Sequence, residues 1–65
     1  MYPNLLTDML KADVTLKMAS DHLKITVELF ERKLKGGTFF TLNEAKKLKA
    51  FIHSERPLEE LFEEA

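Results

Sequence analysis

With 65 residues, no cysteine and a formal net charge of −1, the chain has the composition of one small domain spanning residues 1–65. Its length excludes a second core, because a fold of this size buries only about 60% of the surface that its unfolded chain exposes, and the lack of cysteine excludes disulfides and cysteine metal sites. We expect a cytoplasmic protein with neither a signal peptide nor a membrane span, because the sequence contains no basic leader and no run of roughly 18 apolar residues.

Apolar spacing and capping residues predict three helices in the first half of the chain. The first covers residues 3–12, ends at Asp13, and has an apolar stripe formed by Leu6, Met9 and Leu10. The second covers about 16–23 and the third about 27–35, and a threonine that can cap the free amides precedes each of them. Gly36 and Gly37 predict the end of the third helix, since glycine adopts a left-handed backbone without penalty.

Two further helices are predicted in the second half. Thr41 and Glu44 form a capping box, which predicts a fourth helix from 42 to about 53. Its apolar stripe consists of Leu42, Ala45, Leu48 and Ile52. Pro57 opens a short fifth helix whose apolar residues are Leu58, Leu61 and Phe62. The loop aromatics Phe39 and Phe40 are expected to be partly buried. No segment alternates with a period of two, so the fold class is all-α.

The second and third predicted helices, separated by residues 24–26, have the spacing of a helix-turn-helix. A set of residues spread along the chain can be compared with the patterns of known families. In chain order they are Thr15, Leu23, Ile25, Thr26, Phe30, residues 32–36, residues 41–48 and residues 57–62. In this order they resemble the phage Cro and repressor family of helix-turn-helix DNA-binding proteins, also called the xenobiotic-response-element type. The resemblance covers nearly the full length.

This resemblance implies a compact five-helix, lambda-repressor-like domain that regulates transcription in a phage or prophage. It also implies a recognition helix in the major groove of double-stranded DNA and binding as a homodimer to a roughly palindromic operator. The chain departs from the family pattern at Leu16, where members usually have Gln, and at Lys24, where they usually have Gly. A left-handed backbone at Lys24 would cost on the order of 1 kcal/mol.

A helical wheel of the third helix turns Phe30 and Leu34 toward the core, with Thr26 and Lys33 beside them. The residues expected to read bases are Thr26, Val27, Glu28 and Arg32. Arg32 can donate two hydrogen bonds to guanine, and Glu28 can accept one from cytosine. The residues expected to contact the DNA backbone are Lys17, Lys35, Gly37 and Thr38, the last two through their amides. Glu31 is expected to pair with Lys35 at i, i+4.

Charge distribution leaves other interpretations open. The last eight residues contain four Glu and no base, so residues 1–56 contain 10 bases and 7 acids, a net charge of +3. This can be a DNA-facing surface or an ordinary solvated face. Glu28, Glu31 and the acidic fifth helix also fit a protein-interaction module that retains the fold without binding DNA. The apolar side of the fifth helix either seals the monomer core or packs against a second copy.

Sites for other chemistry are not expected. His22 and His53 have no partner at metal-ligand spacing, and Ser20 and Ser54 belong to no nucleophile, base and acid combination. The sequence therefore predicts no enzyme activity, no metal and no cofactor.

Overall fold

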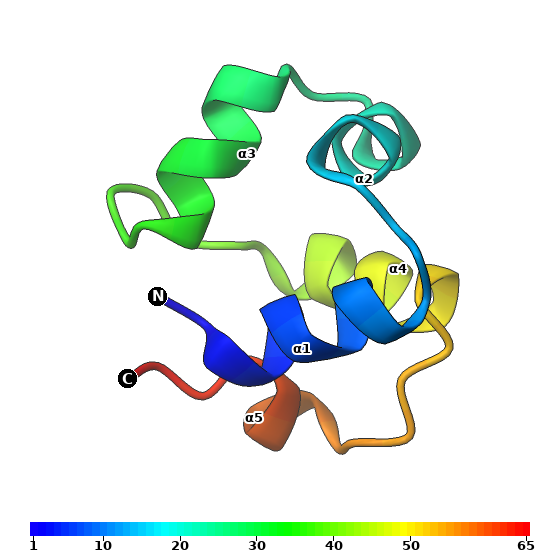
Figure 1. Ribbon diagram of the computed structural model, residues 1–65. Coiled ribbons are helices and arrows are strands. Elements are labelled where there is room, and N and C mark those ends of the chain that lie inside the picture. Colours follow the sequence, from blue (N-terminus) through cyan, green and yellow to red (C-terminus); the bar gives the residue numbers. More distant parts are fainter.

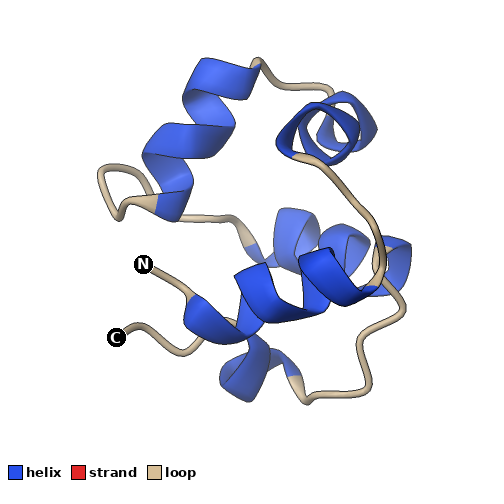
Figure 2. Cartoon of the chain, in the orientation of Figure 1, coloured by secondary structure: helices blue, strands red, loops and turns tan.

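The structure, a computed structural model, describes all 65 residues and contains five helices and no strand (Figures 1 and 2). The helices are α1 (Pro3–Lys11), α2 (Leu16–Leu23), α3 (Val27–Leu34), α4 (Leu42–Phe51) and α5 (Leu58–Leu61). The two termini lie side by side, and the Ala65 amide donates a hydrogen bond to the Met1 carbonyl (3.1 Å). The prediction of an all-α fold with five helices is confirmed. No helix has both the length and the hydrophobicity that crossing a bilayer requires.

Three helices begin with a threonine cap. The hydroxyls of Thr15 and Thr26 accept hydrogen bonds from the amides three residues later, each at 3.1 Å. Thr41 and Glu44 form the predicted capping box: the Glu44 amide donates to Thr41 Oγ1 (3.0 Å) and the Thr41 amide donates to Glu44 Oε1 (2.9 Å). These bonds satisfy amides that have no partner within the helix, and they fix where α2, α3 and α4 begin.

The first four helices end in the same way. After each, a residue with a positive φ donates its amide to a carbonyl three residues back, and the next residue donates to one five residues back. The left-handed residues are Asp13, Lys24, Gly36 and His53. Asp13 and Gly36 fulfil this role as predicted. The prediction that the fourth helix extends to residue 53 is wrong, because α4 ends at Phe51 and His53 already has a φ of 53°.

The core is a single cluster to which all five helices contribute. Its buried members are Tyr2, Leu5, Met9, Ala19, Leu23, Phe30, Leu34, Leu48, Ile52 and Leu61. Two apolar predictions fail here. Leu10 is 78% exposed while Leu5 is fully buried, because the buried face of α1 is centred on the Leu5 and Met9 pair. Leu42 also projects into solvent from the first turn of α4.

Phe40 links four parts of the chain. Its ring makes edge-to-face contacts with the rings of Tyr2, Phe30 and Phe62, at centroid separations of 5.6, 5.8 and 5.3 Å. The expectation that Phe40 is partly buried is confirmed, whereas the same expectation for Phe39 is wrong, since Phe39 is 77% exposed. In a non-helical segment neighbouring side chains point in different directions, and only one of these two rings faces the core.

A buried ion pair joins α3 to α4. Lys33 Nζ lies 2.9 Å from Glu44 Oε1 and donates a second hydrogen bond to the Phe39 carbonyl (3.0 Å). Only 5% of Lys33 is exposed, so its stem fills the core, and two of the three N–H donors of its ammonium group have an acceptor. Lys33 therefore belongs to the core, and the exposed basic residues at the end of α3 are Arg32 and Lys35.

A second polar network ties α1 to the segment before α5. Asp8 is buried, and its Oδ2 accepts hydrogen bonds from Ser54 Oγ (2.7 Å) and Arg56 Nε (3.0 Å). Burial alone would raise the pKa of the Asp8 carboxyl, but the bonds from Ser54 and Arg56 and the charges of Arg56 and Lys11 hold the pKa below its usual value. Burial also acts to raise the pKa of the Glu44 carboxyl, but the hydrogen bonds from Thr41 and Lys33 and the charge of Lys33 outweigh this effect. The pKa of Glu44 is therefore lowered as well.

The lowered pKa values of the Asp8 and Glu44 carboxyls predict that the protein loses stability in acid. A group whose pKa is lower in the folded state adds stability above its unfolded pKa, about 4 for both residues, and loses it as pH falls through the folded pKa. We expect the free energy of unfolding to decrease as the pH is lowered below about 4. Urea titrations between pH 2 and 7 with circular dichroism detection measure this, and Asp8→Asn should flatten the profile. An unchanged slope in Asp8→Asn would contradict the role of Asp8.

Candidate nucleic-acid interface

The residues with predicted functional roles lie mainly on the unit formed by α2, the turn Lys24–Thr26 and α3. The unit is held from inside by the buried residues Ala19, Ser20, Leu23, Phe30 and Leu34. The Ile25 amide donates to the Ser20 carbonyl (3.0 Å), which closes the end of α2. Lys24 has a φ of 59°, so it adopts the left-handed conformation, which carries a cost for a residue other than glycine. The orientation of α3 is thus fixed at both ends, by the turn and by the core.

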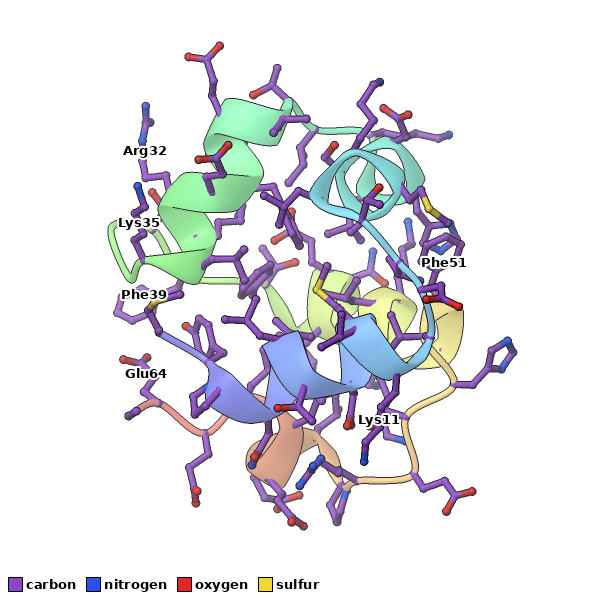
Figure 3. All side chains as sticks on the ribbon, viewed as in Figure 1. Lys11, Arg32, Lys35, Phe39, Phe51 and Glu64 are labelled. Carbon is purple, nitrogen blue, oxygen red and sulfur yellow. The ribbon has the colours of Figure 1, made fainter.

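The outer side of α3 is exposed and carries two cations. Arg32 and Lys35 extend away from the body of the molecule on the same side (Figure 3). Neither makes an ion pair or side-chain hydrogen bond, and the expected pair between Glu31 and Lys35 is not formed. The four ion pairs of the structure involve other lysines and arginines. Both cationic groups are free to bind an external anion or acceptor.

The other residues predicted to read bases lie near the start of α3. Thr26 and Glu28 are exposed and Val27 is half-buried. Thr26 Oγ1 already accepts the Leu29 amide, which leaves its hydroxyl proton and one lone pair for an external partner. Glu28 has no cationic partner within the chain, which leaves its carboxylate able to accept hydrogen bonds.

The residues predicted to contact a nucleic-acid backbone differ in whether their hydrogen-bond donors are free or already have an acceptor. The Gly37 amide donates to the Arg32 carbonyl (3.0 Å), so it is not a free donor, whereas the Thr38 amide has no backbone acceptor. Lys17 Nζ binds both carboxylate oxygens of Asp21, at 2.9 and 3.0 Å. This pair is largely exposed and contributes little, so Lys17 can exchange Asp21 for a phosphate at small cost.

Gly37 has a different role, which the sequence did not indicate. A Cβ atom added at Gly37 would lie only 3.0 Å from Arg32 Cγ. The glycine therefore leaves room for the Arg32 stem to cross the end of α3. The position of the Arg32 guanidinium depends in part on this missing side chain.

No cluster of three or more His, Asp or Glu side chains is arranged to hold a metal ion. His22 stacks on the Phe51 ring at a centroid separation of 4.1 Å, which gives it a packing role between α2 and α4. Chemically, α3 and its two cap residues offer two free cations, a carboxylate and a hydroxyl at exposed positions. Comparisons of the chain with models of known families, with curated proteins and with solved structures each give no match.

Proposed function

We propose that this protein is a sequence-specific DNA-binding transcriptional regulator of the Cro and repressor type. In this proposal the α2–turn–α3 unit is a helix-turn-helix in a lambda-repressor-like domain, and α3 enters the major groove of double-stranded DNA. The protein acts as a homodimer in the cytoplasm of a bacterial or phage-infected cell. The free, exposed state of Arg32 and Lys35 on the outer side of a rigidly held α3 supports this most strongly.

Each exposed residue has a defined part in the proposed complex. Arg32 donates two hydrogen bonds to O6 and N7 of a guanine, and Val27 contacts a thymine methyl group. Glu28 accepts a hydrogen bond from a cytosine amino group, and Thr26 donates its hydroxyl proton. Lys35, the Thr38 amide and Lys17 contact phosphates and position the protein without reading sequence. Gly37 acts through the room that it leaves for Arg32.

A second candidate function is a protein-interaction module with this fold that does not bind DNA. It is favoured by Glu28, an unpaired exposed carboxylate at the start of α3, where it would approach a polyanion. In that case a basic partner surface would occupy the outer side of α3. The two candidates differ in a simple way, since only a DNA-binding protein retains duplexes at low salt.

Selection of bound fragments from a random duplex pool, followed by salt titration of the selected duplex, tests the proposal. Affinity should fall as salt rises, because neutralised phosphates release counterions. We expect Arg32→Ala to lose about 1–3 kcal/mol of discrimination at one base pair. Lys35→Ala should weaken binding to all sequences and reduce the salt slope by about one. Lys47→Ala, which removes an exposed lysine from α4, is the matched control and should change little.

Two outcomes would count against the proposal. Absence of any duplex binding at low salt would reject DNA binding and favour the interaction module. Equal losses at every sequence for Arg32→Ala and Lys35→Ala would retain DNA binding but reject the separate roles of the two residues.

A further inference from the structure

A mostly apolar groove of about 360 Å³ lies on the face formed by the α3–α4 loop, the start of α4, α5 and the chain end. Three aromatic rings form its base, those of Tyr2, Phe40 and Phe62. Each ring packs edge-to-face against the other two, at centroid separations of 5.6, 5.8 and 5.3 Å. Tyr2 is buried and the other two residues are half-buried. The core therefore reaches the surface here, and covering the groove removes apolar side chains from water.

Two further lining residues project into solvent beside these rings. Phe39 is 77% exposed and Leu42 is 65% exposed. A single exposed leucine is ordinary on a protein surface, whereas exposed side chains that join an apolar groove form one continuous patch. Such patches mark surfaces that bind another molecule.

The charged residues that line the groove are all acidic. They are Glu59 from α5 and Glu64 from the chain end, and no base is among the lining residues. Neither carboxylate is in an ion pair, because the four ion pairs of the structure use other acids. The Tyr2 hydroxyl donates a hydrogen bond to Glu64 Oε1 (3.3 Å), which holds that carboxylate at the groove without neutralising it. Figure 3 shows Phe39 and Glu64 at the same edge of the molecule.

We propose that this groove binds a short peptide segment of another protein, in which a large apolar side chain is next to lysine or arginine. The apolar side chain covers the aromatic base of the groove, and the basic side chains pair with Glu59 and Glu64. Charge complementarity selects this partner, because an acidic segment would be repelled by two carboxylates that have no base beside them.

The size of the groove also favours a segment over a folded domain. A volume of about 360 Å³ is near the lower end of the range of about 300–1,000 Å³ that is typical of binding pockets, so the groove accommodates one or two anchoring side chains. A second copy that met this groove with its own groove would bring two more carboxylates to the contact and no lining base.

The proposal goes beyond DNA binding. No residue of α2 or α3 lines the groove, so the segment is bound on a surface separate from the outer side of α3. The protein can therefore bind the segment with or without DNA. This gives a DNA-bound regulator a contact for a second protein.

Selection from a displayed library of random short peptides, with the full chain and no DNA, tests the proposal. The enriched peptides should contain a large apolar residue next to lysine or arginine. Fluorescence anisotropy then measures the affinity of the most enriched peptide for the unsubstituted chain and its variants. Binding should weaken as salt rises, because the charged side chains that pair are exposed.

One pair of variants tests the apolar part of the contact. Phe39→Ser should weaken binding of the peptide about tenfold or more, as expected for an aromatic anchor. Leu10→Ser is the matched control: Leu10 is 78% exposed but lies on α1 outside the groove, so this variant should bind the peptide normally. Circular dichroism checks that each variant is folded.

A second pair tests the charges. Glu59→Gln combined with Glu64→Gln should weaken binding about fivefold and reduce its salt dependence. Asp13→Asn combined with Glu55→Gln changes the net charge by the same amount at two exposed carboxylates outside the groove. This control should bind the peptide as the unsubstituted chain does.

Three results would overturn the proposal. The first is that no peptide is enriched, including the case in which the chain dimerises and Phe39→Ser abolishes the dimer, which would assign the groove to a second copy. The second is that the enriched peptides lack bases or are acidic. The third is that Phe39→Ser binds the enriched peptide as tightly as the unsubstituted chain. Arg32→Ala should still bind the peptide, so failure of DNA binding and failure of peptide binding are separate results.

Discussion

Glu44→Ala should lower the free energy of unfolding by about 3 kcal/mol or more, because it leaves the buried Lys33 ammonium group without its counter-charge. The same change removes the Glu44 half of the capping box at the start of α4, which adds to the loss. A chain of 65 residues has a total stability of only about 3–10 kcal/mol. Glu44→Ala should therefore lose about a third or more of the total stability, as measured by urea titration with circular dichroism.

Two further variants separate the ion pair from the cap. Glu44→Gln keeps a side-chain oxygen for the Thr41 amide but removes the negative charge, so its loss should come from Lys33 alone. Lys33→Met combined with Glu44→Gln removes both charges and fills similar volumes, so it should be clearly more stable than Glu44→Ala. If Glu44→Gln were as stable as the unsubstituted chain, the cap and not the unpaired charge would explain the loss in Glu44→Ala.

The sequence predicted the cap but not the ion pair. A threonine followed three residues later by glutamate is a local signal, so residues 41–44 sufficed to locate the start of α4. Lys33 and Glu44 are 11 residues apart, and only the packing of α3 against the segment that leads into α4 brings them together. The wheel placed Lys33 beside the core, but no local signal indicated its partner.

The same distinction applies to the candidate site. The wheel correctly placed Arg32 and Lys35 outside and Phe30 inside, because the period of a helix determines relative directions along it. The Gly37 amide is occupied because of the way in which α3 ends. Lys17 pairs with Asp21 because the rotamers of the two side chains bring their charges together. In α1 the expected stripe was Leu6, Met9 and Leu10, but Leu5 and Met9 also share a face, and only contact with the other helices selects the face that contains Leu5.

Phe40→Ala should lower the free energy of unfolding by about 3 kcal/mol, whereas Phe39→Ala, one residue earlier, should change it by less than about 0.5 kcal/mol. Phe40 is half-buried and contacts the rings of Tyr2, Phe30 and Phe62, so its removal leaves a cavity where α3, the N-terminal segment and the chain end meet. Edge-to-face aromatic pairs each add about 0.5–1.5 kcal/mol beyond the area that they bury. Phe39 is mostly surrounded by solvent, so truncating it costs the isolated monomer almost nothing.

Urea titration of the two variants measures this difference in the free energy of unfolding. Phe40→Leu retains an apolar side chain at the centre of the cluster and should recover part of the stability that Phe40→Ala loses. Similar losses of stability for Phe39→Ala and Phe40→Ala would contradict the placement of Phe39 in solvent and of Phe40 against the core, because a ring surrounded by solvent cannot support the fold.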